Sequence, residues 1–316
     1  MIQLQVIYEH ELAEIMSGDR KFWLALGNFD GVHLAHQYIL NDVINKAYIQ
    51  NCVSGVLLLE PHPEIEFLGR RNFLLTTLEE KIAKIADLGI EYAVLKPFTN
   101  DFASLTPGEF AAWLKQKIGV CGVSIGYDYS FGYKGMGTAV SLKKFGENYQ
   151  FPVSIINPIY WGEKMTVSSE LCRKLIKEGK IEEANDMLNA PYQLTGKVIK
   201  GEGRGSKLGF PTANMKLPPE KVVPRRGVYI VRVYENVRTF RGICNIGCKP
   251  TFQGEDILAE TYILDEALPD LYQKEITISI HKFLRPEQKF VNAKQLRQQI
   301  ALDIEKAKEL LASSTN

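Results

Sequence analysis

Short apolar, β-rich segments alternate with amphipathic helical segments through about the first 190 residues of this chain. Strand, helix and strand in succession require right-handed crossovers, so we predict an α/β fold with a parallel sheet covered on both faces. Such sheets bind ligands at the carboxyl ends of their strands. The predicted strands are 22–29, 54–61, 91–98 and 122–129, and the predicted helices between them are 33–50, 76–90 and 106–118.

From about residue 190 the pattern changes to short β-rich segments separated by Gly, Pro and charged turns, which is typical of an antiparallel barrel. The predicted strands are 192–201, 227–235, 239–247, 257–265 and 274–284. A helix over 292–312, with apolar residues at 296, 300, 304 and 307, is predicted to pack against the barrel. A further helix over 171–188 leads to Asn189 and Pro191, so we predict domains at 1–189 and 190–316.

Composition and charge exclude few classes of protein, but they favour a globular protein of two domains. The chain has 316 residues, a length that favours two domains, and it is 45% hydrophobic and 24% charged, as expected of a globular protein. With 38 basic and 37 acidic side chains, the net charge of +1 supports neither a nucleic-acid nor a membrane-surface partner. The first residues lack the basic and apolar regions of a secretory signal. Five scattered cysteines favour reduced core thiols and a cytoplasmic location.

Two histidines lie three residues apart in the stretch ALGNFDGVHLAHQ, Ala25 to Gln37. Gly27 follows a predicted strand, and His33 and His36 occupy the first turn of the next helix on one face. The positive end of a helix binds phosphate, and two imidazoles there could stabilise charge developing at phosphorus. The alternative is a pair of surface histidines. A metal pair is disfavoured because no third ligand follows with suitable spacing.

The same stretch resembles the G-x-F-D-x-x-H-x-G-H signature of the nucleotidyltransferases that include the bacterial riboflavin kinase/FAD synthetases. The resemblance implies a Rossmann-like first domain in which His33 and His36 act on the phosphates of ATP. It also implies nucleotide contacts from the residues that precede them, namely Gly27, Asn28, Phe29 and Asp30. One departure is Ala35, which replaces the glycine between the histidines and could narrow the approach of a phosphate to the backbone.

Two further segments continue the resemblance toward the flavin. LEPHPEI matches the Pro-His-Pro turn of the family and implies flavin contacts from Pro61, His62 and Pro63, although the tripeptide taken alone favours a rigid loop after a strand. IGYDYSFGYKGMG places Asp128 where relatives have Asp or Asn, which implies another flavin contact. Ser130 stands where many relatives have arginine and is a second departure.

TVSSELCRKLIKEG resembles the family's I-S-S-T-x-I-R phosphate segment and implies that Ser168, Ser169 and Arg173 bind ATP. Hydroxyl groups at a helix start and an arginine one turn later suit a triphosphate. Glu170 and Leu171 depart from the pattern, and a carboxylate facing the triphosphate would repel it. The alternative is that Glu170 points into solvent.

The second half resembles the flavokinase signature over TGKVIKGEGRGSKLGFPTANM. The resemblance implies that a flexible loop wraps the ATP phosphates through Gly201, Gly203, Gly205 and Gly209. The alternative for this segment is a glycine-rich hairpin without a ligand. Thr212 and Asn214 supply hard oxygen atoms that suit Mg²⁺ held largely by water and phosphates.

RGICNIGCKPTF, AETYILDEALPDLY and FLRPEQKF complete the resemblance in the family's order. Glu260 is implied as the general base that accepts the proton of the ribityl hydroxyl, against the alternative of a solvent-facing acid. Arg285 is implied to seat the flavin or the nucleotide, and Asn245 and Thr251 to support the site.

The resemblance therefore implies a first domain, 1–189, that adenylylates FMN and a second, 190–316, that phosphorylates riboflavin. The expected substrates are ATP, riboflavin and FMN, with Mg²⁺ as cofactor and FAD as product. The departures at positions 35, 130, 170 and 171 leave open a kinase whose adenylyltransferase domain is weakened. A flavin-binding regulator without chemistry is a third alternative, which intact Thr212, Asn214 and Glu260 disfavour.

Overall fold

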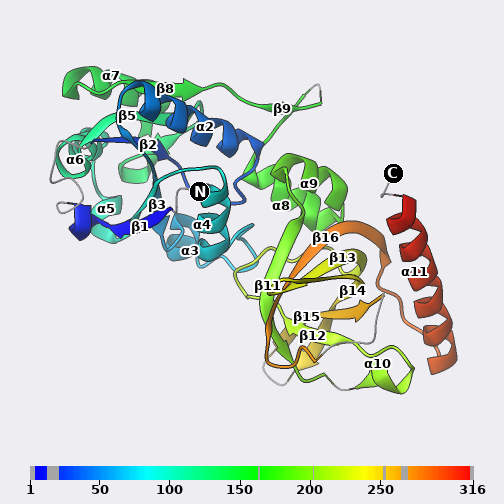
Figure 1. Cartoon of the computed structure of the whole chain (residues 1–316). Coiled ribbons are helices and arrows are strands. Elements are labelled where there is room, and N and C mark those ends of the chain that lie inside the picture. The colour runs from blue at the N-terminus through cyan, green and yellow to red at the C-terminus, as the bar shows by residue number, and fades with distance from the viewer. Residues whose placement is uncertain are drawn as a thin grey trace. The chain divides into compact units, whose positions relative to one another are not determined.

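A computed structural model describes residues 4–12, 21–162, 164–201, 203–251, 254–264 and 270–313. The chain divides into two compact units (Figure 1). The first consists of Met1–Arg70 and Thr76–Ser169, and the second of Arg71–Leu75 and Glu170–Asn316. A short piece of the N-terminal half therefore belongs to the unit that holds the C-terminal barrel.

The first unit is built on a parallel sheet of six strands in the order β1-β4-β3-β2-β5-β8, which confirms the predicted α/β class. Its strands are β1 Gln5–Tyr8, β2 Phe22–Leu26, β3 Val53–Glu60, β4 Tyr92–Pro97, β5 Val120–Gly126 and β8 Val153–Ile156. Among its described residues, the helices of seven residues or more are α2 Leu34–Ile49, α4 Leu78–Asp87, α6 Pro107–Trp113 and α7 Ala139–Tyr149. Shorter elements are η1 Glu9–Glu11, α3 Pro63–Leu68, α5 Asn100–Ala103, η2 Leu114–Ile118, η3 Tyr133–Gly135, and the strands β6 Ser130–Phe131, β7 Gly137–Thr138, β9 Tyr160–Trp161 and β10 Met165–Thr166.

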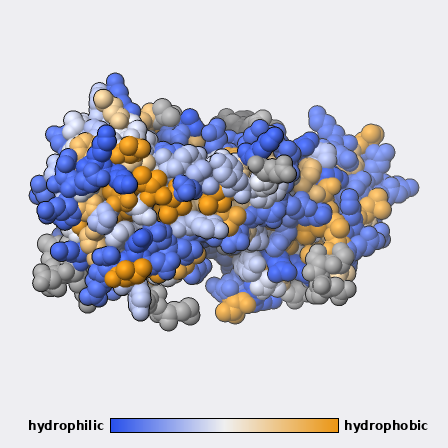
Figure 2. Space-filling view, turned by 90° about the horizontal axis from the view of Figure 1, so that it is seen from above, coloured by the Kyte–Doolittle hydropathy of each residue, from blue (hydrophilic) through white to orange (hydrophobic). Residues whose placement is uncertain are grey.

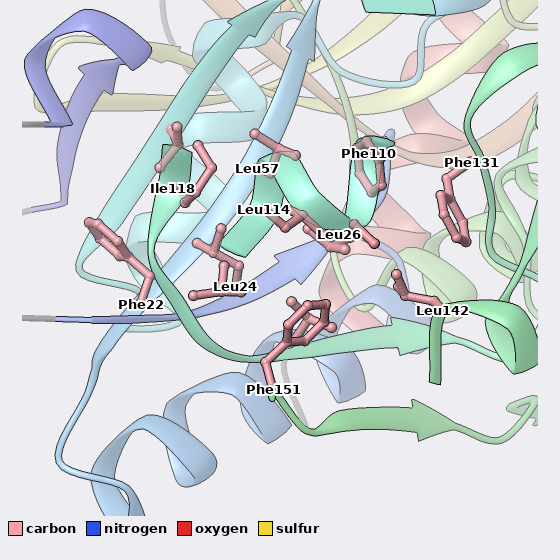
Figure 3. Close-up of a cluster of buried hydrophobic side chains, with 14 of the residues drawn as sticks. Phe22, Leu24, Leu26, Leu57, Phe110, Leu114, Ile118, Phe131, Leu142 and Phe151 are labelled. Atoms are coloured by element: carbon pink, nitrogen blue, oxygen red, sulfur yellow. The ribbon is translucent and has the colours of Figure 1, made fainter. Parts of the chain in front are cut away.

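Both faces of this sheet are buried, as the side chains of β2 show by pointing alternately into two apolar clusters. Phe22 and Leu24 enter one apolar cluster, where Phe110 of α6 and Leu142 of α7 meet them (Figure 3). The intervening Trp23 enters a second cluster, which α2 and α4 cover from the opposite face. Successive strand residues point to opposite faces, so an entirely apolar strand requires this double cover.

Two helices differ from their predictions because glycine and a change of helical pitch interrupt them. The helix predicted over 171–188 is two helices, α8 Ser169–Glu178 and α9 Ile181–Leu188, separated at Gly179, whose φ is +82°. The helix predicted over 106–118 ends as α6 at Trp113 and continues as one π-helical segment, η2. The strand predicted over 22–29 ends at Leu26, where the glycine-bearing turn begins.

The second unit contains the predicted antiparallel barrel, which is closed in the order β11-β12-β15-β14-β13-β16 and includes a strand, β12, that was not predicted. Its elements are β11 Tyr192–Ile199, α10 Arg204–Lys207, β12 Ala213–Lys216, β13 Gly227–Glu235, β14 Arg238–Thr251, β15 Gly254–Ile263, β16 Glu275–Pro286 and α11 Ala293–Ser313. α11 packs Ala307 and the half-buried Ile304 against Val228 and Ile230 of β13, which confirms the predicted docking of the terminal helix. Residue 265, the end of one predicted strand, lies outside the described residues.

The domain boundary predicted at residue 189 stays a prediction. The contacts of α9 show which part of the chain this helix packs against. Asn185 of α9 donates its side-chain amide to the Ile280 carbonyl at 2.9 Å and accepts from the Tyr192 amide at 2.8 Å. Glu182 pairs with Lys282 at 3.0 Å. These contacts attach α9 to the barrel strands β11 and β16.

The expectation of five reduced thiols is wrong for one pair, because Cys52 and Cys121 are joined by a disulfide. They lie 69 residues apart in sequence, so spacing did not reveal them. Cys52 directly precedes β3 and Cys121 lies in β5, and these strands flank β2 on either side. Of the other cysteines, Cys172 and Cys244 are buried and Cys248 is half-buried.

The surface in view in Figure 2 is mostly hydrophilic, with hydrophobic side chains in small groups between polar ones. No helix among the described residues is long and apolar enough to span a bilayer.

Candidate functional sites

The residues predicted to bind nucleotide and flavin in the first unit follow neighbouring strands at one edge of the parallel sheet. Gly27 follows β2, Pro61 follows β3, and Asp128 follows β5. β2 lies between β3 and β5, and the order of strands along the chain reverses at β2. Parallel strands end at the same edge, and ligands bind where the strand order reverses. The topology therefore places these three predicted segments at the expected binding edge.

The turn between β2 and α2 holds an unusual backbone. Phe29, Gly31 and Val32 all have positive φ, at +49°, +86° and +46°. A β-branched residue such as Val32 rarely adopts this region, and each such residue costs on the order of 1–3 kcal/mol. The ring of Phe29 lies against Gly27, where a Cβ atom would come within 3.2 Å of it. Surrounding contacts must hold this turn in place.

Thr76 supplies much of that restraint, although it lies 45 residues further along the chain. Its Oγ1 accepts a hydrogen bond from the Gly31 amide at 3.0 Å and donates to Asp30 Oδ1 at 3.3 Å. Its backbone amide donates to the same carboxylate oxygen at 3.0 Å. Asp30 and Thr76 are 1% and 3% exposed, so these bonds form in a nearly dry environment. The sequence offered no signal for this contact.

His33 and His36 lie together at the start of α2, as predicted. His33 is the N-cap residue, and its Nδ1 accepts a hydrogen bond from the His36 amide at 3.4 Å. The two rings stack with centroids 3.6 Å apart, and the Phe29 ring lies 5.0 Å from His36. Because Nδ1 of His33 accepts, hydrogen bonding assigns its proton to Nε2. That tautomer presents an N–H donor, as a phosphate oxygen requires.

The Pro-His-Pro segment forms the start of a short helix. Pro61 follows a cis peptide bond, and His62 caps α3 by accepting the Glu64 amide on Nδ1 at 3.2 Å. His62 is 4% exposed. Asp128 is exposed, with its carboxylate beside Gly126 at the end of β5. These positions agree with, but do not test, the predicted flavin contacts.

A buried lysine at this edge was not predicted. Lys81 of α4 is 3% exposed, and burial lowers its pKa, while the carboxylates of Asp30 and Glu60 oppose that shift. Burial in turn raises the pKa of Glu60, against the influence of Lys81. The signal was present, since Lys81 falls between Leu78 and Ile85 on the apolar side of a helix.

The predicted phosphate segment at Ser168–Arg173 crosses from one compact unit to the other. In the first unit, Ser169 donates its hydroxyl to the Asp30 carbonyl at 2.9 Å, next to the histidine turn. In the second, Arg173 lies 3.8 Å above the Phe73 ring and donates Nε to the Phe73 carbonyl at 2.8 Å. Glu170 is exposed, which favours the solvent-facing alternative for its carboxylate. Phosphate binding by Ser168, Ser169 and Arg173 stays a prediction.

The second unit contains a cavity of about 410 Å³ that gathers the residues predicted for the kinase reaction. Its polar lining includes Thr212, Asn214, Asn245, Glu260, Arg285, Glu287, Gln288 and Asp303. Its apolar lining includes Leu208, Phe210, Val228, Ile243, Leu258, Tyr262, Phe290, Leu296 and Ile300. Apolar walls with a few convergent polar groups are typical of a small-molecule site.

Three strands bring the predicted base and metal ligands together in this cavity. Asn214 of β12 and Asn245 of β14 are both register partners of Glu260 on β15. Asn214 is 6% exposed and donates its amide nitrogen to the Thr212 carbonyl at 3.2 Å. Its Oδ1 is buried and accepts no hydrogen bond from any described residue. A buried amide oxygen in that state fits a cation ligand. The side chain of Thr251 lies outside the described ones.

The glycine loop before β12 is closely packed at two glycines. A Cβ atom on Gly201 would lie 2.5 Å from the Asn214 side-chain nitrogen, and one on Gly205 would lie 2.4 Å from the Phe210 carbonyl oxygen. Larger residues would displace Asn214 or the backbone that leads to Thr212. Gly203 and Gly209 have positive φ and open space around them. Phosphate binding by the four glycines stays a prediction.

Arg285 lines the cavity, and an acid on α11 holds it there. Its guanidinium donates to Asp303 through Nε at 2.9 and 3.0 Å and through Nη2 at 2.7 Å. Gln299 donates to the same carboxylate at 2.9 Å. Sequence reasoning missed Asp303, yet it lies on the apolar stripe of α11 between Ile300 and Ala307. A charged residue in such a stripe indicates a buried ionic partner.

Comparison with known proteins agrees with this geometry. The family model described as riboflavin kinase matches residues 188–311, and that described as FAD synthetase matches residues 15–171. The chain is 36% identical over 283 residues to the bifunctional riboflavin kinase/FMN adenylyltransferase of Listeria monocytogenes, covering 89% of each chain. The Bacillus subtilis protein of the same designation is 34% identical, with 97% of each chain covered. The chain belongs to this family.

Membership in the bifunctional riboflavin kinase/FMN adenylyltransferase family assigns the two activities to the chain, with ATP, riboflavin and FMN as substrates. Among solved structures, the crystal structure of a macrolide-efflux protein from Streptococcus pneumoniae is similar at a TM-score of 0.85. The two are 29% identical, and the match covers 98% of this chain and 99% of that one. This similarity supports the fold described above.

Proposed function

We propose that the cavity of the second unit is the riboflavin kinase site, with Glu260 as general base and Thr212 and Asn214 as ligands of an ATP-bound Mg²⁺. One observation carries the proposal: Asn214, the register partner of Glu260, has a buried amide oxygen that accepts no hydrogen bond from the part of the chain that the structure describes. A binding protein without chemistry has no need for a carboxylate beside such an oxygen. Mg²⁺, when bound, would neutralise charge on the ATP phosphates.

In this proposal the ribityl hydroxyl of riboflavin attacks the γ-phosphorus of ATP while Glu260 accepts its proton. The bond from the γ-phosphorus to the bridging oxygen breaks, and ADP leaves. Positioning and charge stabilisation supply most of the rate in phosphoryl transfer, so the protein must fix the acceptor and exclude water. The apolar walls would hold the isoalloxazine, and Arg285 would contact the flavin or the nucleotide from a position fixed by Asp303.

We further propose that the edge of the sheet in the first unit is the adenylyltransferase site. A phosphate oxygen of FMN attacks the α-phosphorus of ATP, and pyrophosphate leaves without a covalent enzyme intermediate. His33 and His36 would donate hydrogen bonds to phosphate oxygens, aided by the positive end of α2. The exposed carboxylate of Glu170 supports an active domain over a weakened one, since solvent screens its charge. A cytoplasmic location stays a prediction.

One assay tests these assignments together. Purified protein is incubated with riboflavin, ATP and Mg²⁺, and the flavins are separated by chromatography. We expect FMN and then FAD. FMN without FAD would support the weakened domain, and neither product would favour a flavin-binding regulator. Glu260→Gln should stop the first step, while FMN supplied directly should still be converted to FAD.

A further inference from the structure

A five-residue segment of the N-terminal half, Arg71–Leu75, belongs to the second unit, and we call it the strap. Four backbone hydrogen bonds of 2.7–2.9 Å join its residues 72–74 to residues 219–222, which precede β13. Leu74 forms a parallel bridge with Lys221. The strap is therefore held by regular backbone pairing and not only by side-chain packing.

Lys221 fixes the end of the strap. It is 1% exposed, and its ammonium donates to the Leu75 carbonyl at 2.7 Å and lies 5.0 Å from the Tyr192 ring centroid. The Tyr192 hydroxyl donates to the Val222 carbonyl at 2.7 Å. A buried ammonium is costly unless hydrogen bonded, so the Leu75 carbonyl is held firmly where the barrel requires it.

The residue after Leu75 is Thr76, which restrains the adenylyltransferase turn. Its hydroxyl and its amide hold Asp30 Oδ1 and the Gly31 amide, in the middle of three residues with positive φ. His33, the N-cap residue of α2, follows Gly31 by two residues. The position of this histidine therefore depends on a turn whose restraints include Thr76.

We propose that Thr76 is a positioning residue for adenylyl transfer and that Lys221, acting through the Leu75 carbonyl, fixes the segment that presents it. The proposal rests on the adenylyltransferase function proposed above. The hydrogen bonds of two adjacent residues, Leu75 and Thr76, support the proposal. Leu75 is hydrogen bonded by a buried group of the second unit, and Thr76 is hydrogen bonded to the catalytic turn of the first.

Thr76→Val tests the first part, because valine keeps the shape and the backbone amide but removes the hydroxyl. The buried Gly31 amide would lose its acceptor, a change that commonly costs about 5- to 100-fold in an equilibrium or rate. We expect kcat/KM for FAD synthesis to fall by about that factor, mainly through kcat. Thr76→Ser should restore most of it. Riboflavin phosphorylation, measured on the same sample, should stay within about twofold.

Hydrogen exchange gives a readout that needs no catalysis. The Gly31 amide should exchange at least about tenfold faster in Thr76→Val than in the native protein or Thr76→Ser. Unchanged exchange together with unchanged FAD synthesis would overturn the role of Thr76. If the native protein formed no FAD, the proposed function would fall, and the exchange result would still decide whether Thr76 holds the turn.

Lys221→Met tests the second part, with Lys197→Met, an exposed lysine of β11, as its control. We expect Lys221→Met to lower FAD synthesis about tenfold, and Lys197→Met to leave it unchanged. In the double variant with Thr76→Val, the loss should be close to the larger single loss, because both act on one turn. A loss equal to the product of the two would overturn the link through Leu75. Should Lys221→Met fail to fold, the Thr76 pair still decides the first part, and Lys221→Gln decides the second: exchange of the Gly31 amide and FAD synthesis both unchanged in that variant would overturn the role of Lys221.

Discussion

Asp303→Asn should destabilise the second unit and weaken riboflavin binding. The side chains of Asp303 and Arg285 are 7% and 15% exposed, and the carboxylate receives three contacts of 3.0 Å or less from the guanidinium. Removing one partner of a buried pair typically costs about 3–5 kcal/mol, because the other charge stays buried. Asparagine retains one acceptor, so we expect about 3 kcal/mol. For a unit of this size that lowers Tm by about 6–12 °C.

Thermal unfolding followed by circular dichroism measures the first effect, and kinase kinetics measure the second. Glu305→Gln, an exposed acid two residues further along α11, is the matched control and should leave both unchanged. KM for riboflavin should rise in Asp303→Asn more than KM for ATP if Arg285 seats the flavin. A double variant, Arg285→Met with Asp303→Leu, should regain stability but not riboflavin affinity. A Tm for Asp303→Asn within 1 °C of the control would refute the reasoning.

Three further outcomes follow from the sites. Glu260→Gln should reduce riboflavin phosphorylation by about 10²- to 10⁴-fold while riboflavin binding, measured by flavin fluorescence, is retained; turnover within a fewfold of native would remove Glu260 from the mechanism. Glu170→Thr should leave KM for ATP in FAD synthesis within about twofold, because the carboxylate is exposed, and a clear decrease would place it at the phosphates. Burial raises the pKa of Cys244 to about 12, so the side chain is a protonated, poorly nucleophilic thiol at pH 8. Iodoacetamide should therefore modify it only after unfolding, which mass spectrometry detects.

Local pattern predicted most of the architecture. Apolar alternation and helical periodicity gave the parallel sheet, the barrel and the terminal helix, because each segment buries the face its own residues define. The Gly-bearing turn and the two histidines were predicted correctly as neighbours, since a helix start fixes their spacing. The break at Gly179 could have been foreseen from the glycine itself.

Contacts between distant segments were beyond such reasoning. Thr76 reaches Asp30 across 46 residues, and Lys221 reaches Leu75 across 146. No local pattern specifies these pairs, because each side chain is compatible with an ordinary surface position until the tertiary fold brings its partner close. Asp303 could be predicted only in part. Its place on an apolar stripe indicated that it needs a buried partner, but no local pattern indicated that the partner is Arg285.

The discontinuity of the second unit limits how the two enzymes can be separated at the level of the gene. A reading frame that begins anywhere after residue 75 encodes the barrel without the strap, and the Lys221 ammonium then loses the Leu75 carbonyl. Gene fission would therefore remove a hydrogen-bond acceptor from Lys221 and the backbone partners of residues 219–222. Recombination between relatives that exchanged the barrel alone would combine residues 219–222 of one protein with the strap of another. The contacts between them would be lost wherever the two proteins differ at these positions. The complete set of contacts of the second unit is therefore encoded on both sides of the first unit's central segment.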